Sequence, residues 1–493
     1  MDKTEKQFKE DFNNANKVDL SFDVDQLEPN TKKNRHKIRP YKIRLIITSS
    51  VLASLVIGLS IPVLMALLKV DESVNETTRK YTLAQIKVAE SNSFKKLNNV
   101  NYPNFERPLK SDITSEEENA YHNFANLTYH SLVDNSKADN MSYSAIGLYS
   151  NMNEMAFASS RNDLTIRFDN LLGLDATKRM QFYDKVIMAN SYASENASTQ
   201  IKNAAFLSNE YEYYPDFVDY LTNVYSEAYQ IDFNTQKKKM VEWVNQAVKS
   251  NGFIDEKFLE LNEETALYLF STLYFKNAWL NKYVAADNIT DDFHIDNKTV
   301  IKTKYMKHSY SLDKYYDYGS YISFKDYYYG RYASITYLVP KDIDDNIFEL
   351  TKTANIFEED NSKAVLPEKH HEIMVNLKLP KFKNKVDINM KDSLENLGFG
   401  DMFDSNYDSF GGAFITNSHE NVYLQNIKQR NEVEFNEDGT IVKSVSMASL
   451  GATKAMPMKL DTLDVSLNQP FIYIIRDIND VPIFVGHLDN PKA

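Results

Sequence analysis

An uncharged apolar stretch near the N-terminus limits how this chain can fold. Residues Leu45–Leu68 contain no charged side chain and exceed the roughly 20 residues that a helix needs to cross a bilayer. Basic residues precede the stretch and acidic residues follow it, which predicts a cytoplasmic N-terminus. A cleaved signal peptide is the alternative, although its apolar region and its charged lead are normally shorter. The basic residues are Lys32, Lys33, Arg35, Lys37, Arg39, Lys42 and Arg44, and the acidic residues are Asp71, Glu72 and Glu76.

The rest of the chain divides around this stretch. Residues 1–44 are polar and predict a disordered cytoplasmic tail, and residues 69–111 predict a polar stalk. Residues 112–493 predict one large folded domain, because Tyr and Phe are abundant (32 and 28) whereas Gly and Pro are scarce (13 each). We therefore expect a single-pass protein of the cell membrane, with residues 45–68 as its transmembrane helix and the folded domain outside the cell.

The composition excludes several classes of function. A formal net charge of −13 argues against nucleic acid as a partner. The absence of cysteine excludes disulfides, thiolate zinc sites and a cysteine nucleophile. The sequence also lacks GxSxG, HExxH, GxGxxG and a phosphate-binding loop, and His370-His371 before Glu372 lacks the spacing of metal ligands. We therefore expect no enzyme activity, no cofactor and no metal site.

Hydrophobic periodicity in residues 112–493 indicates an α+β domain, because helical patterns come first and strands dominate the end. The two last strand-like runs are separated by a short polar turn, which predicts an antiparallel hairpin. Helices are expected at Glu116–Val133, Asp216–Ser226, Thr235–Lys249 and Asp392–Leu397. Strands are expected at Leu267–Phe275, Ile322–Phe324, Ser334–Val339, Ile373–Lys378, Phe471–Asp477 and Pro482–Leu488.

One stretch differs from the acidic and aromatic sequence around it. Residues Gly439–Ala455 contain no acid and no aromatic residue, and Lys443 and Lys454 are their only charges. Composition alone favours a flexible surface loop. However, alternate side chains are uncharged, and such a face can enter a sheet without burying a charge, so the stretch can be a loop in one state and a strand in another. The residues on that face are Thr440, Val442, Ser444, Ser446, Ala448 and Leu450.

Several motifs in residues 112–493 together resemble the serpin family. Five lie in the C-terminal third in the family's order, including its closing signature, and three lie upstream. The motifs are NMSYSAIGLY (Asn140–Tyr149), LFSTLYFKNAW (Leu269–Trp279), DDFHID (Asp291–Asp296), LKLPKF (Leu377–Phe382), LGFGDMF (Leu397–Phe403), NEVEFNEDGT (Asn431–Thr440), NQPFIYIIRD (Asn468–Asp477) and IFVGHLDNP (Ile483–Pro491). The resemblance implies a fold of about three β-sheets and eight or nine helices, with an exposed reactive loop.

The resemblance also implies that the chain inhibits a serine or cysteine protease as a monomeric suicide substrate. The protease cleaves the reactive loop, which then inserts into the largest sheet before the acyl-enzyme is hydrolysed. By family loop length, the reactive bond is Thr453–Lys454. A loop one residue longer places it at Lys454–Ala455, with Lys454 as bait for a trypsin-like protease, and Ala455–Met458 is a further alternative.

The same resemblance assigns two regions of the family fold. The hinge leads into the reactive loop, and the shutter lies at the start of the helix near Ser144. Gly439 gives the hinge backbone freedom, and Thr440 would enter the sheet first. The shutter departs from the family pattern, because the family's bridging Asn and His are replaced here by Ser271 and Gln429. In the hinge, Val442 is bulkier than the residue that the family usually has there. A membrane-tethered serpin that binds or adheres without inhibiting is therefore the alternative function. The hinge residues are Glu437, Asp438, Gly439, Thr440, Val442 and Ser444. The shutter, together with the point of the sheet where the loop first inserts, contains Ser144, Ser271, Gln429 and Trp279.

Overall fold

The computed structural model describes residues 94–135, 140–261, 264–368, 372–415, 421–442 and 461–492. These residues belong to one compact unit. The expected tail, the expected transmembrane helix at 45–68 and most of the expected stalk lie outside the described residues. Among the helices that are described, none has both the length and the hydropathy needed to cross a bilayer.

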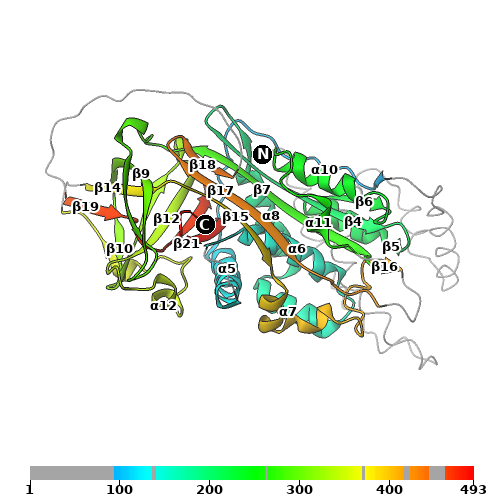
Figure 1. Ribbon diagram of the computed structural model, residues 1–493. Coiled ribbons are helices and arrows are strands. Elements are labelled where there is room, and N and C mark those ends of the chain that lie inside the picture. Colours follow the sequence, from blue (N-terminus) through cyan, green and yellow to red (C-terminus); the bar gives the residue numbers. More distant parts are fainter. Residues whose placement is uncertain are drawn as a thin grey trace, which may run out of the picture. The chain divides into compact units, whose positions relative to one another are not determined.

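The largest sheet has eight strands and forms the centre of the fold (Figure 1). Its strands follow the order β1-β6-β4-β7-β18-β17-β15, and β3 pairs with β4 on one side. The strands are β1 (Lys95–Lys96), β3 (Ser191–Ala193), β4 (Ala197–Ser208), β6 (Ser226–Ile231), β7 (Leu267–Ala278), β15 (Phe382–Asn389), β17 (Lys428–Asn436) and β18 (Gly439–Val442).

Two further large sheets and one short ribbon complete the described strands. The seven-stranded sheet contains β13 (Ala364–Val365), β10 (Tyr315–Asp317), β11 (Tyr321–Tyr327), β12 (Ala333–Pro340), β20 (Phe471–Asp477), β21 (Pro482–Leu488) and β2 (Asn140–Tyr143) in this order. The four-stranded sheet contains β19 (Asp461–Ser466), β14 (Ile373–Pro380), β9 (Val300–Leu312) and β8 (Ile289–His294). The ribbon pairs β5 (Glu212–Tyr213) with β16 (Phe414–Ile415).

Nine α-helices occur within the described ranges. The expected helices and strands are found with boundaries that shift by a few residues, and the expected hairpin of β20 and β21 is antiparallel. The helix expected at Asp392–Leu397 is interrupted, because a π-helical turn follows its first turn and Gly398 is left-handed (φ 87°). The helices are α5 (Ser115–Asn135), α6 (Ala145–Ala158), α7 (Asn162–Leu172), α8 (Ala176–Ala189), α9 (Pro215–Asn223), α10 (Lys237–Ala247), α11 (Glu256–Leu259), α12 (Ile347–Thr351) and α13 (Lys391–Leu394).

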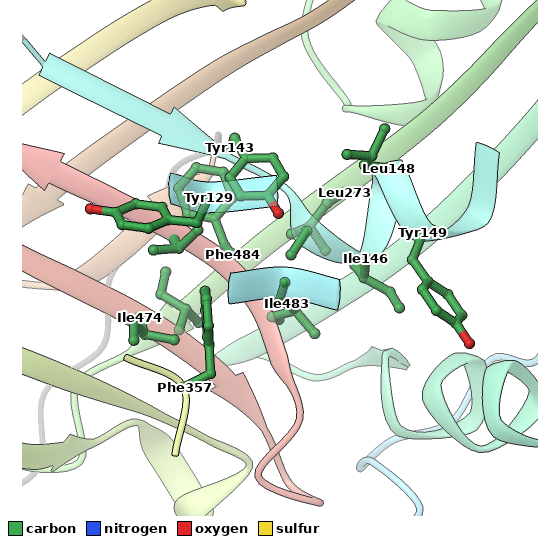
Figure 2. Close-up of a cluster of buried hydrophobic side chains, with 14 of the residues drawn as sticks. Tyr129, Tyr143, Ile146, Leu148, Tyr149, Leu273, Phe357, Ile474, Ile483 and Phe484 are labelled. Atoms are coloured by element: carbon green, nitrogen blue, oxygen red, sulfur yellow. The ribbon is translucent and has the colours of Figure 1, made fainter. Parts of the chain in front are cut away.

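Helix α6 lies at the centre of the main hydrophobic core, and nearly all of its residues are buried. It begins at Ser144, whose hydroxyl accepts a hydrogen bond from the Gly147 N–H and so caps the helix. Figure 2 shows Ile146, Leu148 and Tyr149 of this helix among side chains from α5, β2, β7, β20 and β21. A helix that is buried on nearly every side requires cover on every side, and here the helices α5, α7 and α9 and the strands β7 and β21 provide it.

Residues 94–111, the described part of the expected stalk, lie along the free edge of the large sheet. Phe94 stacks on Tyr229 with ring centroids 4.8 Å apart. The Leu97 N–H donates to the Ala228 carbonyl at 2.8 Å, and the Tyr102 hydroxyl donates to the Asn203 carbonyl at 3.0 Å. This segment therefore covers backbone groups that an edge strand would otherwise expose, and it belongs to the folded body.

Glu154 is a buried acid on α6. Burial raises the pKa of its carboxyl from 4.5 to about 8, and the neighbouring Ser226 hydroxyl only partly opposes this rise. The folded protein therefore holds a proton that the unfolded chain releases above pH 4.5. Stability must decrease as the pH rises from about 4.5 to about 8, and the loss is complete above that range.

We predict that Glu154→Gln stabilises the protein at pH 8 but changes its stability little at pH 4.5, because glutamine keeps the shape and cannot ionise. The gain at pH 8 is expected to be about 2–4 kcal/mol. Denaturant unfolding at both pH values measures it, with Glu118→Gln on the exposed side of α5 as control. An equal effect of Glu154→Gln at both pH values would contradict the assignment.

Candidate functional site

Strand β18 is wedged between β7 and β17 at one end of the large sheet (Figure 1). It is antiparallel to both neighbours, with Thr440 opposite Asn277 on β7 and opposite Phe435 on β17. The start of the stretch that the sequence predicts as either loop or strand is therefore a strand in this structure. Four residues of the stretch are paired, Gly439–Val442.

Thr440 is fully buried and lies against an aromatic wall. Its hydroxyl is 2.7 Å from the Tyr328 hydroxyl, within hydrogen-bond distance. Tyr328 stacks on Trp279 with ring centroids 4.9 Å apart and an interplanar angle of 15°. The Trp279 indole N–H donates to the Asn436 carbonyl at 2.9 Å, which ties the wall to β17. Aromatic stacking and this hydrogen bond fix the surface that receives Thr440.

Gly439 is required by close approach of the backbone. A Cβ atom at this position would lie 2.1 Å from the Asn277 carbonyl oxygen. Any larger residue would push β18 away from β7, so glycine allows the first pair of the wedge to form.

Glu437 fixes the turn that leads into β18. Its carboxylate accepts two hydrogen bonds from the Lys381 ammonium at 2.7 Å and one from the Asn288 amide. Burial alone would raise the pKa of Glu437, but the bonds from Lys381 and Asn288 outweigh burial and lower it. The hinge is therefore held by a charged pair on one side and by the aromatic wall on the other.

Beyond β18 the strands β7 and β17 continue without ladder bonds between them in the described part of the sheet. A cavity of about 50 Å³ lies between their continuing ends. Its lining includes residues of both strands and the start of α6, among them Ser144, Ser271, Leu273, Gln429 and Asn431. The edges of β7 and β17 that face each other beyond β18 are therefore not joined by ladder bonds in the described residues.

Three of the sequence-predicted shutter residues meet at this cavity. The Gln429 amide oxygen accepts from the Ser144 N–H, and the Gln429 amide nitrogen donates to the Ser144 carbonyl, both at 3.0 Å. The Ser271 hydroxyl is buried and has no hydrogen-bond partner among the described residues. A Cβ atom on Gly147 would lie 3.3 Å from that hydroxyl, so Ser271 faces the start of α6.

The remaining predicted positions are only partly described. Ser444, Thr453, Lys454, Ala455 and the pair His370-His371 lie outside the described residues, and of Val442 only the strand position is described. Asp438 accepts from the Trp279 N–H through its carbonyl at 3.3 Å. Three residues that hold the hinge were not predicted, namely Tyr328, Lys381 and Asn288. Each belongs to a segment distant in sequence. The local signals are a Tyr-rich run around Tyr328 and the motif Leu377–Phe382, which contains Lys381.

Comparison with known proteins identifies the family. The sequence profile of the family described as Serpin (serine protease inhibitor) matches residues 119–491. The chain belongs to the serpin family. Relatives of this serpin include the serine protease inhibitor of Cyanea capillata, 26% identical over 60% of this chain and 78% of the relative. Alpha-1-antiproteinase of Bos taurus is 25% identical over 78% of this chain and 91% of the relative.

Solved structures show that the fold is also that of a serpin. The native thermophilic serpin tengpin matches with a TM-score of 0.66 and 19% identity over 80% of this chain and all of that one. The cleaved serpin 42Da matches with a TM-score of 0.64 and 19% identity over 76% of this chain and 99% of that one. The sequence resemblance and the expected serpin fold are therefore confirmed, with nine helices and three large sheets in the described residues.

Proposed function

We propose that this serpin inhibits a serine or cysteine protease by acting as a suicide substrate. The observation that supports this function best is β18, because it pairs with β7 and β17 at one end only, and these two strands are not paired with each other farther along in the described residues. Small uncharged residues follow it on the face shared with Thr440. Two relatives are named as a serine protease inhibitor and an antiproteinase, which also supports inhibition.

The mechanism uses the unfilled part of the sheet as its driving force. The protease nucleophile attacks the carbonyl carbon of Thr453, which breaks the bond to Lys454 and leaves an acyl-enzyme. The chain before the cleaved bond is then free to extend β18 toward the cavity, where it gains ladder hydrogen bonds on both sides. The attached protease is carried along and distorted before water releases it.

The register of β18 specifies where each inserting residue would lie. Thr440 pairs with Asn277 and Phe435, so a strand that continues without a bulge places Ser446 opposite Ser271 and Gln429. Ser446 would share the buried face with Thr440. Its hydroxyl would reach the Ser271 hydroxyl that has no partner among the described residues.

We predict that Thr440→Arg converts the inhibitor into a substrate, because a charged side chain would have to be buried where Thr440 is fully buried. A protein that consists of residues 94–493 is mixed separately with trypsin, elastase, chymotrypsin and subtilisin. A covalent complex is then looked for on denaturing gels. The wild type is expected to form one, Lys443→Arg is expected to match it, and Thr440→Arg is expected to yield cleaved chain only.

Two results would count against inhibition by loop insertion. A complex that survives Thr440→Arg would show that insertion at the hinge is not needed. Cleavage of the wild type by its target without any complex, and without a gain of stability on cleavage, would favour the alternative function of a serpin that binds or adheres without inhibiting.

We predict that Ser446 and Ser271 stabilise the cleaved form together but not the uncleaved form. Ser446→Ala, Ser271→Ala and the double variant are unfolded in guanidinium before and after cleavage beyond residue 450. A coupling of about 1 kcal/mol is expected after cleavage only. Ser449→Ala, on the opposite face of the extended strand, is the control. Coupling that is absent after cleavage, in a chain that does gain stability, would show a different insertion register.

We also propose that residues 45–68 anchor the serpin domain to the outside of the cell membrane, as the uncharged stretch and its flanking charges support. The full chain is expected to remain in membranes after alkaline extraction and to be degraded by protease added to intact cells. A chain that starts at residue 70 is expected to be soluble. Full-length protein recovered intact from the culture medium would contradict the anchor.

A further inference from the structure

The side chain of His308 links parts of all three large sheets at one point. It lies on β9 of the four-stranded sheet, and its Nε2 is 3.2 Å from Oδ2 of Asp326 on β11 of the seven-stranded sheet. Its Nδ1 is 3.0 Å from the carbonyl oxygen of Asn281, which follows the end of β7 in the eight-stranded sheet. The side chains of His308 and Asp326 are buried, with exposed fractions of 6% and 1%.

Both nitrogens of the His308 ring face an oxygen that can only accept. A carbonyl oxygen and an ionised carboxylate carry no proton, so each nitrogen must carry one for both contacts to be favourable. Loss of either proton would place a nitrogen lone pair against an oxygen lone pair. The two contacts together therefore favour the imidazolium, the charged form of the ring.

Asp326 depends on the same contact for its charge balance. Its Oδ1 accepts from the Tyr327 N–H at 2.7 Å, whereas its Oδ2 has no hydrogen-bond partner in the part of the chain that the structure describes. Four phenols face the carboxylate, and burial raises the pKa of each, so they stay neutral. A buried carboxylate without a counter-ion is strongly disfavoured, so His308 and Asp326 stabilise each other's charge. The phenols are those of Tyr283, Tyr310, Tyr328 and Tyr337.

Tyr283 connects this ion pair to the hinge. Its ring stacks on His308, with centroids 4.0 Å apart and an interplanar angle of 16°. It also packs edge-on against Trp279, with centroids 5.6 Å apart. Trp279 belongs to the aromatic wall that receives Thr440. Because Asn281 and Tyr283 both lie in the segment that follows Trp279, His308 holds that segment at two places.

We propose that His308 and Asp326 form a pH-sensitive clamp that positions the aromatic wall behind the hinge. Histidine is the side chain that changes charge near neutral pH. A neutral ring keeps its single proton toward the carboxylate, the stronger acceptor, and loses the bond to Asn281. As the pH rises, the segment after Trp279 is therefore released and the wall loosens. The effect on inhibition rests on the proposed function, whereas the clamp itself does not.

The first test uses Trp279 as a reporter. The chain has two tryptophans, and Trp243→Phe leaves Trp279 as the only one. Its fluorescence emission is recorded in a protein of residues 94–493 from about pH 5 to about pH 9. Far-UV circular dichroism checks that the protein stays folded at each pH. One transition is expected, with a shift to longer wavelength as the pH rises, because a loosened wall admits water to the indole.

Three variants assign this transition. His308→Gln is expected to abolish it, because glutamine does not titrate. Asp326→Asn is expected to move it to lower pH by about 1 unit or more, because the imidazolium loses its counter-ion. This second variant decides if His308→Gln fails to fold. His130→Gln is the control, since its ring contacts Ala354 on another part of the fold, and it is expected to change nothing. The proposal is overturned if the emission of Trp279 shows no transition, or if the transition survives His308→Gln.

A second measurement tests whether the clamp acts on the hinge. With a protease that forms a covalent complex, the ratio of complex to cleaved chain is compared between the wild type and His308→Gln at each pH, so that effects of pH on the protease cancel. The wild type is expected to give severalfold more complex below the Trp279 transition and to match the variant above it. Equal ratios at every pH would overturn the positioning role. If no protease forms a complex while the transition follows His308, the proposed function fails and the clamp stands.

Discussion

The wedge of β18 between β7 and β17 is the contact on which the rest of this structure depends. Backbone N–H and C=O groups inside a sheet must find partners, since a buried unpaired group costs about 1–3 kcal/mol. Near the hinge β18 provides partners for both neighbours, from Gly439 to Val442. Farther along, the two strands flank a small cavity and are not paired with each other in the described residues. In the described part of the sheet, β18 therefore joins β7 and β17 at one end only.

Several independent contacts hold the start of β18 and the hinge before it in place. Glycine at 439 allows β18 to approach the Asn277 carbonyl, and the Thr440 hydroxyl bonds to Tyr328. On the other side of the hinge, the Lys381 ammonium holds the Glu437 carboxylate. Because these contacts come from separate parts of the chain, the hinge is positioned by the assembled fold rather than by its own local sequence.

In the shutter, the amide side chain of Gln429 makes the hydrogen bonds that join β17 to the start of α6. Gln429 both donates to and accepts from the backbone of Ser144, since an amide carries a donor and an acceptor in fixed positions. The resemblance to the serpin family implies a histidine at this position in other members, and a histidine titrates near neutral pH. Glutamine does not titrate, so in this serpin the two bonds between β17 and the start of α6 are independent of pH. The Ser271 hydroxyl, which has no hydrogen-bond partner among the residues that the structure describes, lies at the same point.

The sequence by itself determined the family, the main helices and strands, and the segment that enters the sheet. These features depend on local periodicity and on motifs of adjacent residues, such as the hairpin runs Phe471–Asp477 and Pro482–Leu488. Only the tertiary structure decided which partners surround the hinge, since Tyr328, Lys381 and Asn288 reach it from distant segments. It also decided that residues 94–111 cover a sheet edge and that Glu154 is buried. Burial and long-range register follow from packing, which local patterns do not specify.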